Sequence, residues 1–396
     1  MIAQPTLLSI EDLVTFCRTD PIHLNVYDGG LFLDTLKCSS DLVCALVICC
    51  GNRVSDLKSL REGKVDVADL TRAMRIIDSL SGPSPTTIDA GRILRDPKYA
   101  CQVQEMVTVE SASKIVEQLR GHLVAICVNP SGCRLIQKLL EVSSPSVGMQ
   151  IMHSELSVRI LEICGDVNGN HVVQKFIDLV PSADSTFIID RLREDFNSLI
   201  RLSCHGYGCR VIQRLMTKCD IRDVGYIFDS LCATSDIITA LSEDVFGNYV
   251  MQQAIEFGRD IDRERIGLCF ASHPNIVQLG CSKFASNVVE KYIRFSNKRK
   301  AGTCVVVTKL LLNALLALVD PITGEPGLLA LMKDRYGNYV VRAIIELTSI
   351  EFARETMIVR SIISDNSHVL KKFTFSWHLV ERLEKLNSST DVGFDE

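Results

Sequence analysis

Six five-residue segments of the chain repeat one arrangement of side chains that could hold a ligand. Position one is a small polar group or a thiol, position five is an amide or a charged group, and position two is in most segments a flat group. The segments are Cys133–Gln137, Asn170–Gln174, Cys209–Gln213, Asn248–Gln252, Ser286–Glu290 and Asn338–Arg342. One such segment is what any solvated helix face carries. Six in series predict a ladder of equivalent pockets.

The spacing of the segments predicts the elements that position them. Their first residues are separated by 37, 39, 39, 38 and 52 positions, and self-similarity at such a period is typical of stacked repeats. On a helix, at about 100° per residue, positions one, five and two share a face, while positions three and four point away. Positions three and four are apolar in every segment. We therefore expect amphipathic helices that bury these two positions between neighbouring units.

The segments resemble the RNA-reading pentads of the Pumilio (PUF) family, in which one helical repeat binds one base. The turns Asp166–Gly169, Asp244–Gly247 and Asp334–Gly337 precede three of them and agree with this resemblance. A Gly at the end of such a turn lets the chain bend sharply into the next helix. The C-terminal stretch Lys371–His378 resembles the capping half-repeat of the family.

The resemblance implies an all-α fold, a curved superhelical solenoid of stacked three-helix PUF repeats with an armadillo-like right-handed superhelix. We expect a Pumilio homology domain over 91–387, with seven recognisable repeats and a C-terminal cap, followed by a flexible tail over 388–396. Residues 1–90 would form a degenerate N-terminal repeat or cap with an insertion. Gly30–Thr35 and Gly51–Asp56 compete as the remnant of its pentad.

In the family, positions one and five hydrogen-bond a base edge, and position two stacks between adjacent bases. The resemblance therefore implies that the RNA-binding residues are Gln104, Cys133, Arg134, Gln137, Asn170, His171, Gln174, Cys209, Arg210, Gln213, Asn248, Tyr249, Gln252, Ser286, Asn287, Glu290, Asn338, Tyr339 and Arg342.

The chemistry of the pairs supports a base for each unit. Glu290 with Ser286 suits guanine, because a carboxylate accepts from two N–H groups. Asn with Gln can offer a donor and an acceptor to uracil, and Cys with Gln resembles the adenine pair. The RNA runs antiparallel to the repeats in the family. The resemblance thus implies a UGUAUA-type element whose first base is U or C, followed by two loosely read positions.

Two units depart from the family pattern. Arg342 stands where Gln is usual, and a guanidinium is donor-only. It can donate to the carbonyl oxygens of uracil or to N3 and O2 of cytosine, so we expect a relaxed first position. The unit Ala100–Gln104 lies 33 residues before Cys133 and keeps the position-five Gln. It has no hydrogen-bonding group at position one and no planar stacker, so we expect weak discrimination there.

Composition bounds the remaining possibilities. The net charge is −5, so stacking and base-edge contacts would carry much of the recognition, with a modest salt dependence. The 16 Cys show no zinc-ligand spacing and favour core thiols in a reduced compartment.

The amino terminus lacks a secretory pattern. Val305–Val319 is apolar but short for a bilayer, and we expect it to be the first helix of the last repeat. We expect a cytoplasmic monomer without cofactor, metal or membrane.

Three functions compete. The first is sequence-specific binding of single-stranded RNA, in messenger 3′ untranslated regions, by a post-transcriptional regulator of translation or mRNA stability. Protein co-regulators would bind the convex face or the 295–327 loop region. The second is a PUF-like binder of structured RNA in ribosome biogenesis, which the intact pentads disfavour. The third is a protein-binding helical scaffold. We find no nucleophile–base motif and no phosphate-binding Gly loop, so the sequence does not predict an enzyme.

Overall fold

The computed structural model describes residues 22–27, 30–38, 64–65, 87–298, 302–319 and 326–390. The chain divides into two compact units, Met1–Ile88 and Asp89–Glu396. In the first unit, strands β1 (Ile22–Tyr27), β2 (Gly30–Cys38) and β3 (Lys64–Val65) form an antiparallel sheet in the order β1-β2-β3. Leu24 lies opposite Leu33, and Tyr27 lies opposite Gly30.

This sheet corrects one expectation. Gly30–Thr35 lies in strand β2, so its assignment as the remnant of a helical pentad is wrong. The segment Ile22–Tyr27 alternates apolar and polar residues with a period of two, which favours a paired strand over a helix. The competing candidate, Gly51–Asp56, lies outside the described residues. The assignment of residues 1–90 as a repeat or cap stays a prediction.

In the second unit, the described part of Asp89–Thr390 forms seven consecutive groups of three helices and a closing pair. The first helices are α5 (Ala90–Arg95), α8 (Leu123–Cys127), α11 (Ile160–Gly165), α14 (Phe196–Ser203), α17 (Ser235–Glu243), α20 (Ile276–Cys281) and α23 (Gly327–Lys333). The second helices are α6 (Pro97–Glu105), α9 (Gly132–Val142), α12 (Gly169–Leu179), α15 (Gly208–Lys218), α18 (Gly247–Phe257), α21 (Ala285–Ser296) and α24 (Gly337–Ile345).

The third helices are α7 (Val109–Gln118), α10 (Pro145–Ile151), α13 (Thr186–Glu194), α16 (Ile221–Leu231), α19 (Asp260–Ser272), α22 (Thr303–Ala317) and α25 (Ala353–Asp365). Short π and 3₁₀ segments flank some of them: η1 (Met152–Leu156), η2 (Ser157–Arg159), η3 (Ser182–Ser185) and η4 (Ile350–Phe352). Helices α26 (Ser367–Leu370) and α27 (Trp377–Thr390) close the unit.

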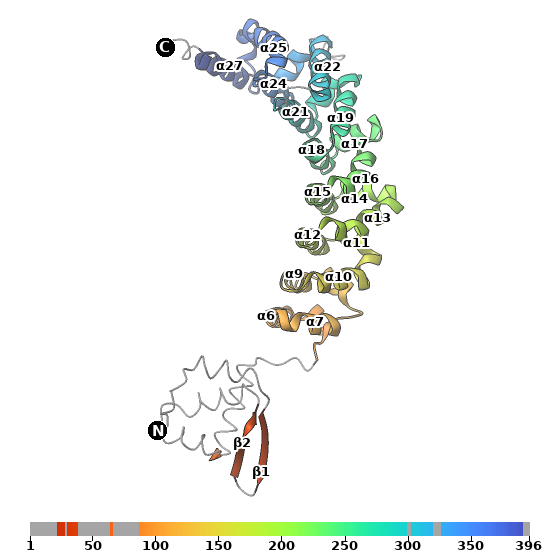
Figure 1. The fold of residues 1–396 in the computed structure, drawn as a ribbon. Coiled ribbons are helices and arrows are strands. Elements are labelled where there is room, and N and C mark those ends of the chain that lie inside the picture. The colour runs from red at the N-terminus through yellow and green to blue at the C-terminus, as the bar shows by residue number, and fades with distance from the viewer. Residues whose placement is uncertain are drawn as a thin grey trace, which may run out of the picture. The chain divides into compact units, whose positions relative to one another are not determined.

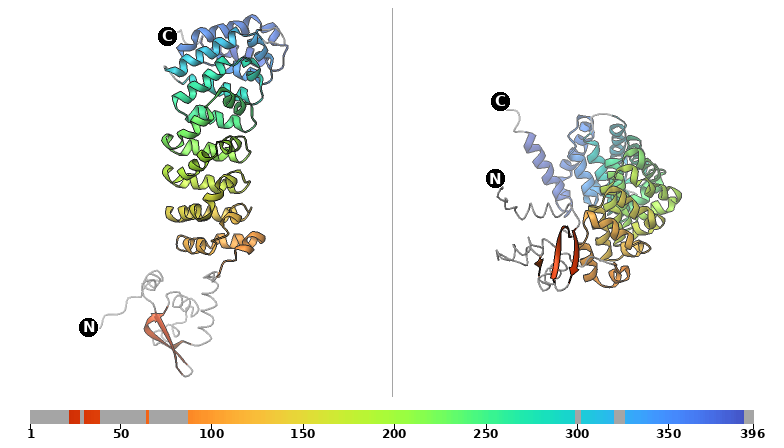
Figure 2. Two further views of the ribbon diagram at one scale, coloured as in Figure 1. Left: turned by 90° about the vertical axis from the view of Figure 1, so that its right-hand side faces the viewer. Right: turned by 60° about the horizontal axis from the view of Figure 1, so that its bottom comes forward.

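The helices of this unit stack in rows, so that each row keeps the same place in every group. Figure 1 shows the second helices, from α6 to α24, along the inner edge of the curve, and the third helices along its outer edge. Each second helix from α6 to α24 packs on the next one, and α24 packs on α27. Figure 2 (left) shows the groups as successive tiers. The predicted all-α curved solenoid is confirmed for this unit.

Glycine starts most of the second helices because two backbones approach each other there. A methyl group on Gly247 would lie 2.6 Å from the carbonyl oxygen of Leu241, and one on Gly337 would lie 2.8 Å from that of Leu331. Among the described residues, only Gly121 and Gly302 have positive φ. The sharp turns expected before these helices are present, but the glycines enter them without positive φ. They supply close contact between the first and second helices.

Two boundaries differ from expectation. Val305–Val319 overlaps α22, which packs on α19 and α25 as the third helix of its group, while α23 is the first helix of the last group. Helix α27 continues to Thr390, beyond the expected domain end at 387. Among the described residues, no single helix has the length and apolarity to span a bilayer, although Ile221–Leu231 and Ser235–Glu243, bent by 91°, reach that threshold together.

Candidate nucleic-acid interface

The six pentads bury and expose their positions in one register. Positions three and four are at most 1% exposed in all six units, as the helical periodicity predicts. Position two is exposed in every unit, reaching 54% at Tyr249 and 48% at Tyr339. Position five is half-buried except at Arg342, which is exposed. Because consecutive second helices pack on one another, the exposed position-two groups form a row along the inner edge.

Position one was expected on an open polar face of each helix, but the structure buries it. All six residues are buried, from Asn170 at 0% to Asn338 at 8% exposed. Position one directly follows the residue that starts each second helix, so its side chain is tucked against the preceding turn. Any contact between position one and a ligand is therefore made through an atom at the bottom of the pocket.

The turn before five of the second helices is held by one side-chain acceptor. Oδ1 of Asp244 accepts the backbone N–H groups of Phe246 and Gly247 at 2.8 and 2.7 Å. Such a bond satisfies amide donors that have no partner in the first turn of a helix. The corresponding acceptors are the carboxylates of Asp166 and Asp334, the side-chain carbonyl of Asn129 and Nδ1 of His205.

The position-one asparagines use their amino groups to fix the same turn. Nδ2 of Asn248 donates to the carbonyl oxygens of Asp244 and Val245 at 2.9 and 3.0 Å. Nε2 of Gln252 donates to Oδ1 of Asn248 at 3.1 Å. Asn170 and Gln174 repeat this arrangement, with the Gln-to-Asn bond at 2.9 Å. The glutamine side-chain oxygen and its second N–H then remain available to a ligand.

The two units with cysteine at position one present a less polar group there. The thiols of Cys133 and Cys209 are directed to the carbonyl oxygens of Pro130 and Gly206. Burial raises the pKa of both thiols, so they stay protonated and act as small apolar groups near neutral pH. Nε2 of Gln137 donates to the Cys133 carbonyl oxygen at 3.2 Å, which leaves the amide oxygen for another partner.

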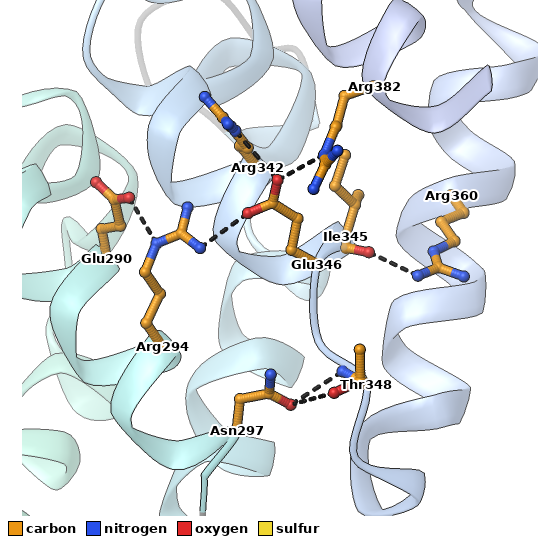
Figure 3. Close-up of polar contacts among 9 residues, drawn as sticks. All are labelled: Glu290, Arg294, Asn297, Arg342, Ile345, Glu346, Thr348, Arg360 and Arg382. Carbon is orange, nitrogen blue, oxygen red and sulfur yellow. Dashed lines mark hydrogen bonds and ion pairs between the residues drawn. The ribbon is translucent and has the colours of Figure 1, made fainter. Parts of the chain in front are cut away.

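The last two pentads share an ionic cluster (Figure 3). Nε of Arg294 donates to Oε1 of Glu290 at 2.8 Å, and Nη1 of the same arginine donates to Oε2 of Glu346 at 2.8 Å. Oε1 of Glu346 also accepts from Nε of Arg342 at 3.2 Å and from Nε of Arg382 at 2.7 Å. The position-five groups of two neighbouring units are thus joined through Arg294 and Glu346.

Burial alone would raise the pKa of Glu346, because a charged carboxylate is poorly solvated there. Hydrogen bonds from Arg294, Arg382 and Arg342 together outweigh this effect and hold the pKa below its usual value. Glu346 is therefore ionised at neutral pH and gives the three guanidinium groups a fixed counter-charge.

A pocket opens beside this cluster between α24 and α27. It has a volume of about 390 Å³ and is lined by Asn338, Tyr339, Arg342, His378, Leu379, Glu381, Arg382 and Lys385. The sequence reading placed Asn338, Tyr339 and Arg342 in the interface but missed Arg382 and Lys385, because only the fold brings α27 against α24. It also missed Arg294 and Glu346, although each lies eight residues after a position-one residue.

The thiols and carboxylates of the described part form no metal site. No group of three or more metal-ligating side chains occurs among the described residues, and the cysteines described there are free. At the other end of the row, Gln104 is half-buried on α6, and the position-two residue of its unit, Cys101, is exposed.

Comparison with known proteins points to one family. The family model described as the Pumilio-family RNA binding repeat matches residues 122–153, 159–193, 198–232, 238–266, 275–297 and 328–357. All six pentads lie inside these matches, whereas Ala100–Gln104 lies before the first of them.

Proteins of the same family are similar in sequence. Suppressor protein MPT5 of Saccharomyces cerevisiae is 27% identical over 280 residues, which cover 64% of this chain and 32% of that protein. Putative pumilio homolog 10 of Arabidopsis thaliana is 29% identical over 260 residues, covering 64% of this chain and 44% of that protein. The chain thus spans less than half the length of these two relatives.

Solved structures share the fold. The structure of PUF-8 in complex with PBE-RNA has a TM-score of 0.64 at 24% identity, covering 84% of this chain and 90% of that one. The Puf4 RNA binding domain bound to the HO endonuclease RNA 3′ UTR recognition sequence has a TM-score of 0.54 at 26% identity, covering 69% of this chain and 82% of that one.

Proposed function

The chain belongs to the Pumilio family of RNA-binding repeat proteins, and from this premise we propose that it binds single-stranded RNA in a sequence-specific manner. The bound element is of the UGUAUA type, read from the last pentad to the first. The observation that carries the proposal is the common register of the pentads. Each unit exposes a position-two side chain and presents a position-five group beside it, along a row of helices in contact.

The unit of Ser286 and Glu290 would read guanine. Oε1 of Glu290 accepts from Arg294, and Oε2 has no hydrogen bond within the described residues. Guanine presents N1–H and an N2 amino group side by side, and a carboxylate can accept from both. Adenine presents a ring acceptor in place of N1–H. A guanine-to-adenine change therefore leaves an acceptor against the carboxylate and costs about 1–3 kcal/mol.

The unit of Asn338 and Arg342 would read cytosine at least as well as uracil. Nδ2 of Asn338 donates to the carbonyl oxygens of Asp334 and Arg335 at 3.0 and 2.8 Å, so only Oδ1 is left to meet a base. Arg342 supplies donors alone. An acceptor beside a donor matches the N4 amino group and N3 of cytosine, whereas uracil would oppose its O4 to Oδ1.

The two asparagine–glutamine units would read uracil through the glutamine. The oxygen of Gln174 or Gln252 can accept the uracil N3–H, and the free N–H can donate to a uracil carbonyl. The cysteine units would read adenine, with the thiol packing on the purine and Gln137 or Gln213 bonding its edge. Stacking on Arg134, His171, Arg210, Tyr249 and Tyr339 would add about 1–3 kcal/mol per base.

We further propose that such elements lie in messenger 3′ untranslated regions and that the protein regulates translation or mRNA stability. It would act in the cytoplasm as a monomer, with protein co-regulators on the convex face or near residues 295–327. Support comes from the family and from the Puf4 domain, which is bound to a 3′ UTR sequence.

Binding of short labelled RNAs, followed by fluorescence anisotropy, tests the proposal. We expect the full chain to bind UGUAUA and CGUAUA with similar affinity, and UAUAUA at least about tenfold more weakly, which corresponds to about 1.4 kcal/mol. Glu290→Gln should reduce the preference for guanine without unfolding the protein. Equal affinity for UGUAUA and UAUAUA would reject sequence-specific reading, and a strong preference for U over C would reject the assignment of the first base.

A further inference from the structure

Charged pairs link successive second helices along the inner edge, in a pattern best seen by counting from position one. At three of the five steps between pentads, position nine of one unit carries an acid and position six of the next carries a base; at the step from the Cys209 unit to the Asn248 unit these positions are the uncharged Thr217 and Gln253. Oε1 of Glu141 lies 2.7 Å from Nζ of Lys175, and Oδ2 of Asp178 lies 2.5 Å from Nη2 of Arg214. Glu256 pairs with Lys291 in the same way. None of these pairs includes a position-five residue.

Between the last two units, position nine carries a base in place of an acid. Position nine of the Ser286 unit is Arg294, and position six of the Asn338 unit is the uncharged Ala343. Arg294 therefore has no charged partner at position six of the next unit. It bonds instead to Glu290 in its own unit and to Glu346, the position-nine residue of the next unit. At this step the link between units includes the position-five groups.

The environment of Glu346 is held in place from several sides (Figure 3). Asn297, just after α21, accepts the backbone N–H groups of Thr348 and Ser349 at 2.9 and 3.1 Å. Nη2 of Arg360 donates to the Ile345 carbonyl oxygen at 2.6 Å. These bonds fix the end of α24, where Glu346 lies with its side chain only 14% exposed. Its carboxylate is thus a fixed point between α21, α24 and α27.

We propose that Glu346 is a positioning residue that couples the reading of two neighbouring bases, the guanine at Glu290 and the first base at Arg342. This inference rests on the proposed function and extends it. Glu346 holds one nitrogen of Arg294, so that Arg294 makes a single bond to Glu290 and leaves Oε2 for the guanine. Glu346 also holds Nε of Arg342, so that the two terminal nitrogens are presented to the first base.

Loss of the Glu346 charge changes both pockets at once. Without it, Arg294 is left with Glu290 as its one carboxylate partner, and a guanidinium binds a carboxylate best with two parallel bonds. That geometry covers the oxygen that the guanine needs. Arg342 loses its anchor and the fixed direction of its donors. The bases read by Gln137, Gln174, Gln213 and Gln252 are unaffected, because their hydrogen bonds do not reach this cluster.

A double-mismatch cycle tests the coupling. The full chain is titrated with four labelled RNAs that carry C or A at the first position and G or A at the second, in an otherwise constant UAUA context. The penalty is the loss of affinity when G at the second position is replaced by A. In the natural protein, we expect this penalty to differ by about fivefold or more between RNAs with C and RNAs with A at the first position. In Glu346→Gln, we expect the penalty for replacing G to be the same, within about twofold, with either first base. We also expect the preference for guanine itself to fall.

Glu256→Gln is the matched control. It removes the acid at position nine of the Asn248 unit, two units before that of Glu346. This acid pairs with Lys291 and touches no position-five side chain, so the first-base preference, the guanine preference and the coupling between them should persist. Arg294→Gln is a second variant, which cuts the bridge but leaves Glu346 bonded to Arg342 and Arg382. It should abolish the coupling while it preserves the first-base preference. Thermal unfolding of each variant shows that the fold is kept.

The outcomes separate the two proposals. If the natural protein shows no preference for guanine, the proposed function fails. If it prefers guanine but its two mismatch penalties are already independent, or if Glu346→Gln and Arg294→Gln retain the coupling of the natural protein, the coupling role of Glu346 fails while sequence-specific binding stands. Loss of coupling in Glu256→Gln as well would also overturn the assignment to Glu346.

Discussion

Nδ1 of His205 accepts the backbone N–H of Gly208 at 3.3 Å, at the turn where the neighbouring units present the carboxylates of Asp166 and Asp244. The corresponding bonds from Gly169 and Gly247 to those carboxylates are 2.7 Å long. The unit of Cys209 is therefore built on the same turn as its neighbours, but with a neutral and more distant acceptor. The difference predicts where a single substitution would stabilise the solenoid.

His205→Asp should raise the free energy of unfolding by about 0.5–1 kcal/mol, because a carboxylate accepts the two backbone N–H groups more strongly than an imidazole nitrogen. Urea denaturation followed by circular dichroism measures the change. The reverse substitution in the next unit, Asp244→His, is the matched control and should destabilise by a similar amount. A stabilising effect of both substitutions would contradict the assigned role of the acceptor.

Asn248→Ala should lower the stability of the free protein by about 1–3 kcal/mol, because it removes the side-chain donor to the carbonyl oxygens of Asp244 and Val245 from a buried position. Gln252→Ala removes the one hydrogen bond that Gln252 donates to Oδ1 of Asn248, so it should cost about 0.5–1.5 kcal/mol, less than the loss of Asn248 itself. Chemical denaturation without RNA distinguishes the two. If Asn248→Ala leaves the free protein unchanged, position one serves recognition alone.

Tyr249→Ala should weaken RNA binding by about 1–3 kcal/mol, since the ring is 54% exposed on the inner edge and free to stack on a base. Tyr249→Phe keeps the flat ring and should bind nearly as well as the natural protein. Both variants should unfold at the temperature of the natural protein. Similar binding by Tyr249→Ala and the natural protein would exclude stacking at this position.

Acid should remove the contribution of the Glu346 cluster to stability. The pKa of Glu346 is lowered in the folded protein by its three arginines, against the opposing effect of burial. A carboxyl with a lowered folded pKa contributes stability above its unfolded pKa, about 4.3, and loses it as the pH falls through the folded value. Natural protein and Glu346→Gln should therefore differ in unfolding free energy at pH 7, and the difference should shrink below about pH 4. Denaturation curves at several pH values measure this; a constant difference would show that Glu346 is not ionised in the fold.

The order and register of the pentads follow from the sequence, because helical periodicity is a local property. Four near-constant spacings and six pairs of apolar residues at positions three and four are enough to predict a row of amphipathic helices, and those positions are buried in the structure. The classes of side chain at positions two and five are also written in the sequence. Local pattern did not identify strands β1 and β2, and Gly30–Thr35 of β2 was one of the two candidates for a degenerate helical unit.

Tertiary structure alone decided which polar atoms are free to meet a ligand. The sequence predicts that the asparagine at position one is an exposed hydrogen-bonding group. In the structure, its amino group donates to two carbonyl oxygens of the preceding turn and is not available to a ligand. Glu290 and Arg342 are 52 residues apart, and their connection through Arg294 and Glu346 exists because α21 packs on α24. The physical reason is that periodicity fixes the direction of a side chain on its own helix. Its hydrogen-bond partners come from other helices and turns, and those are set only when the helices pack.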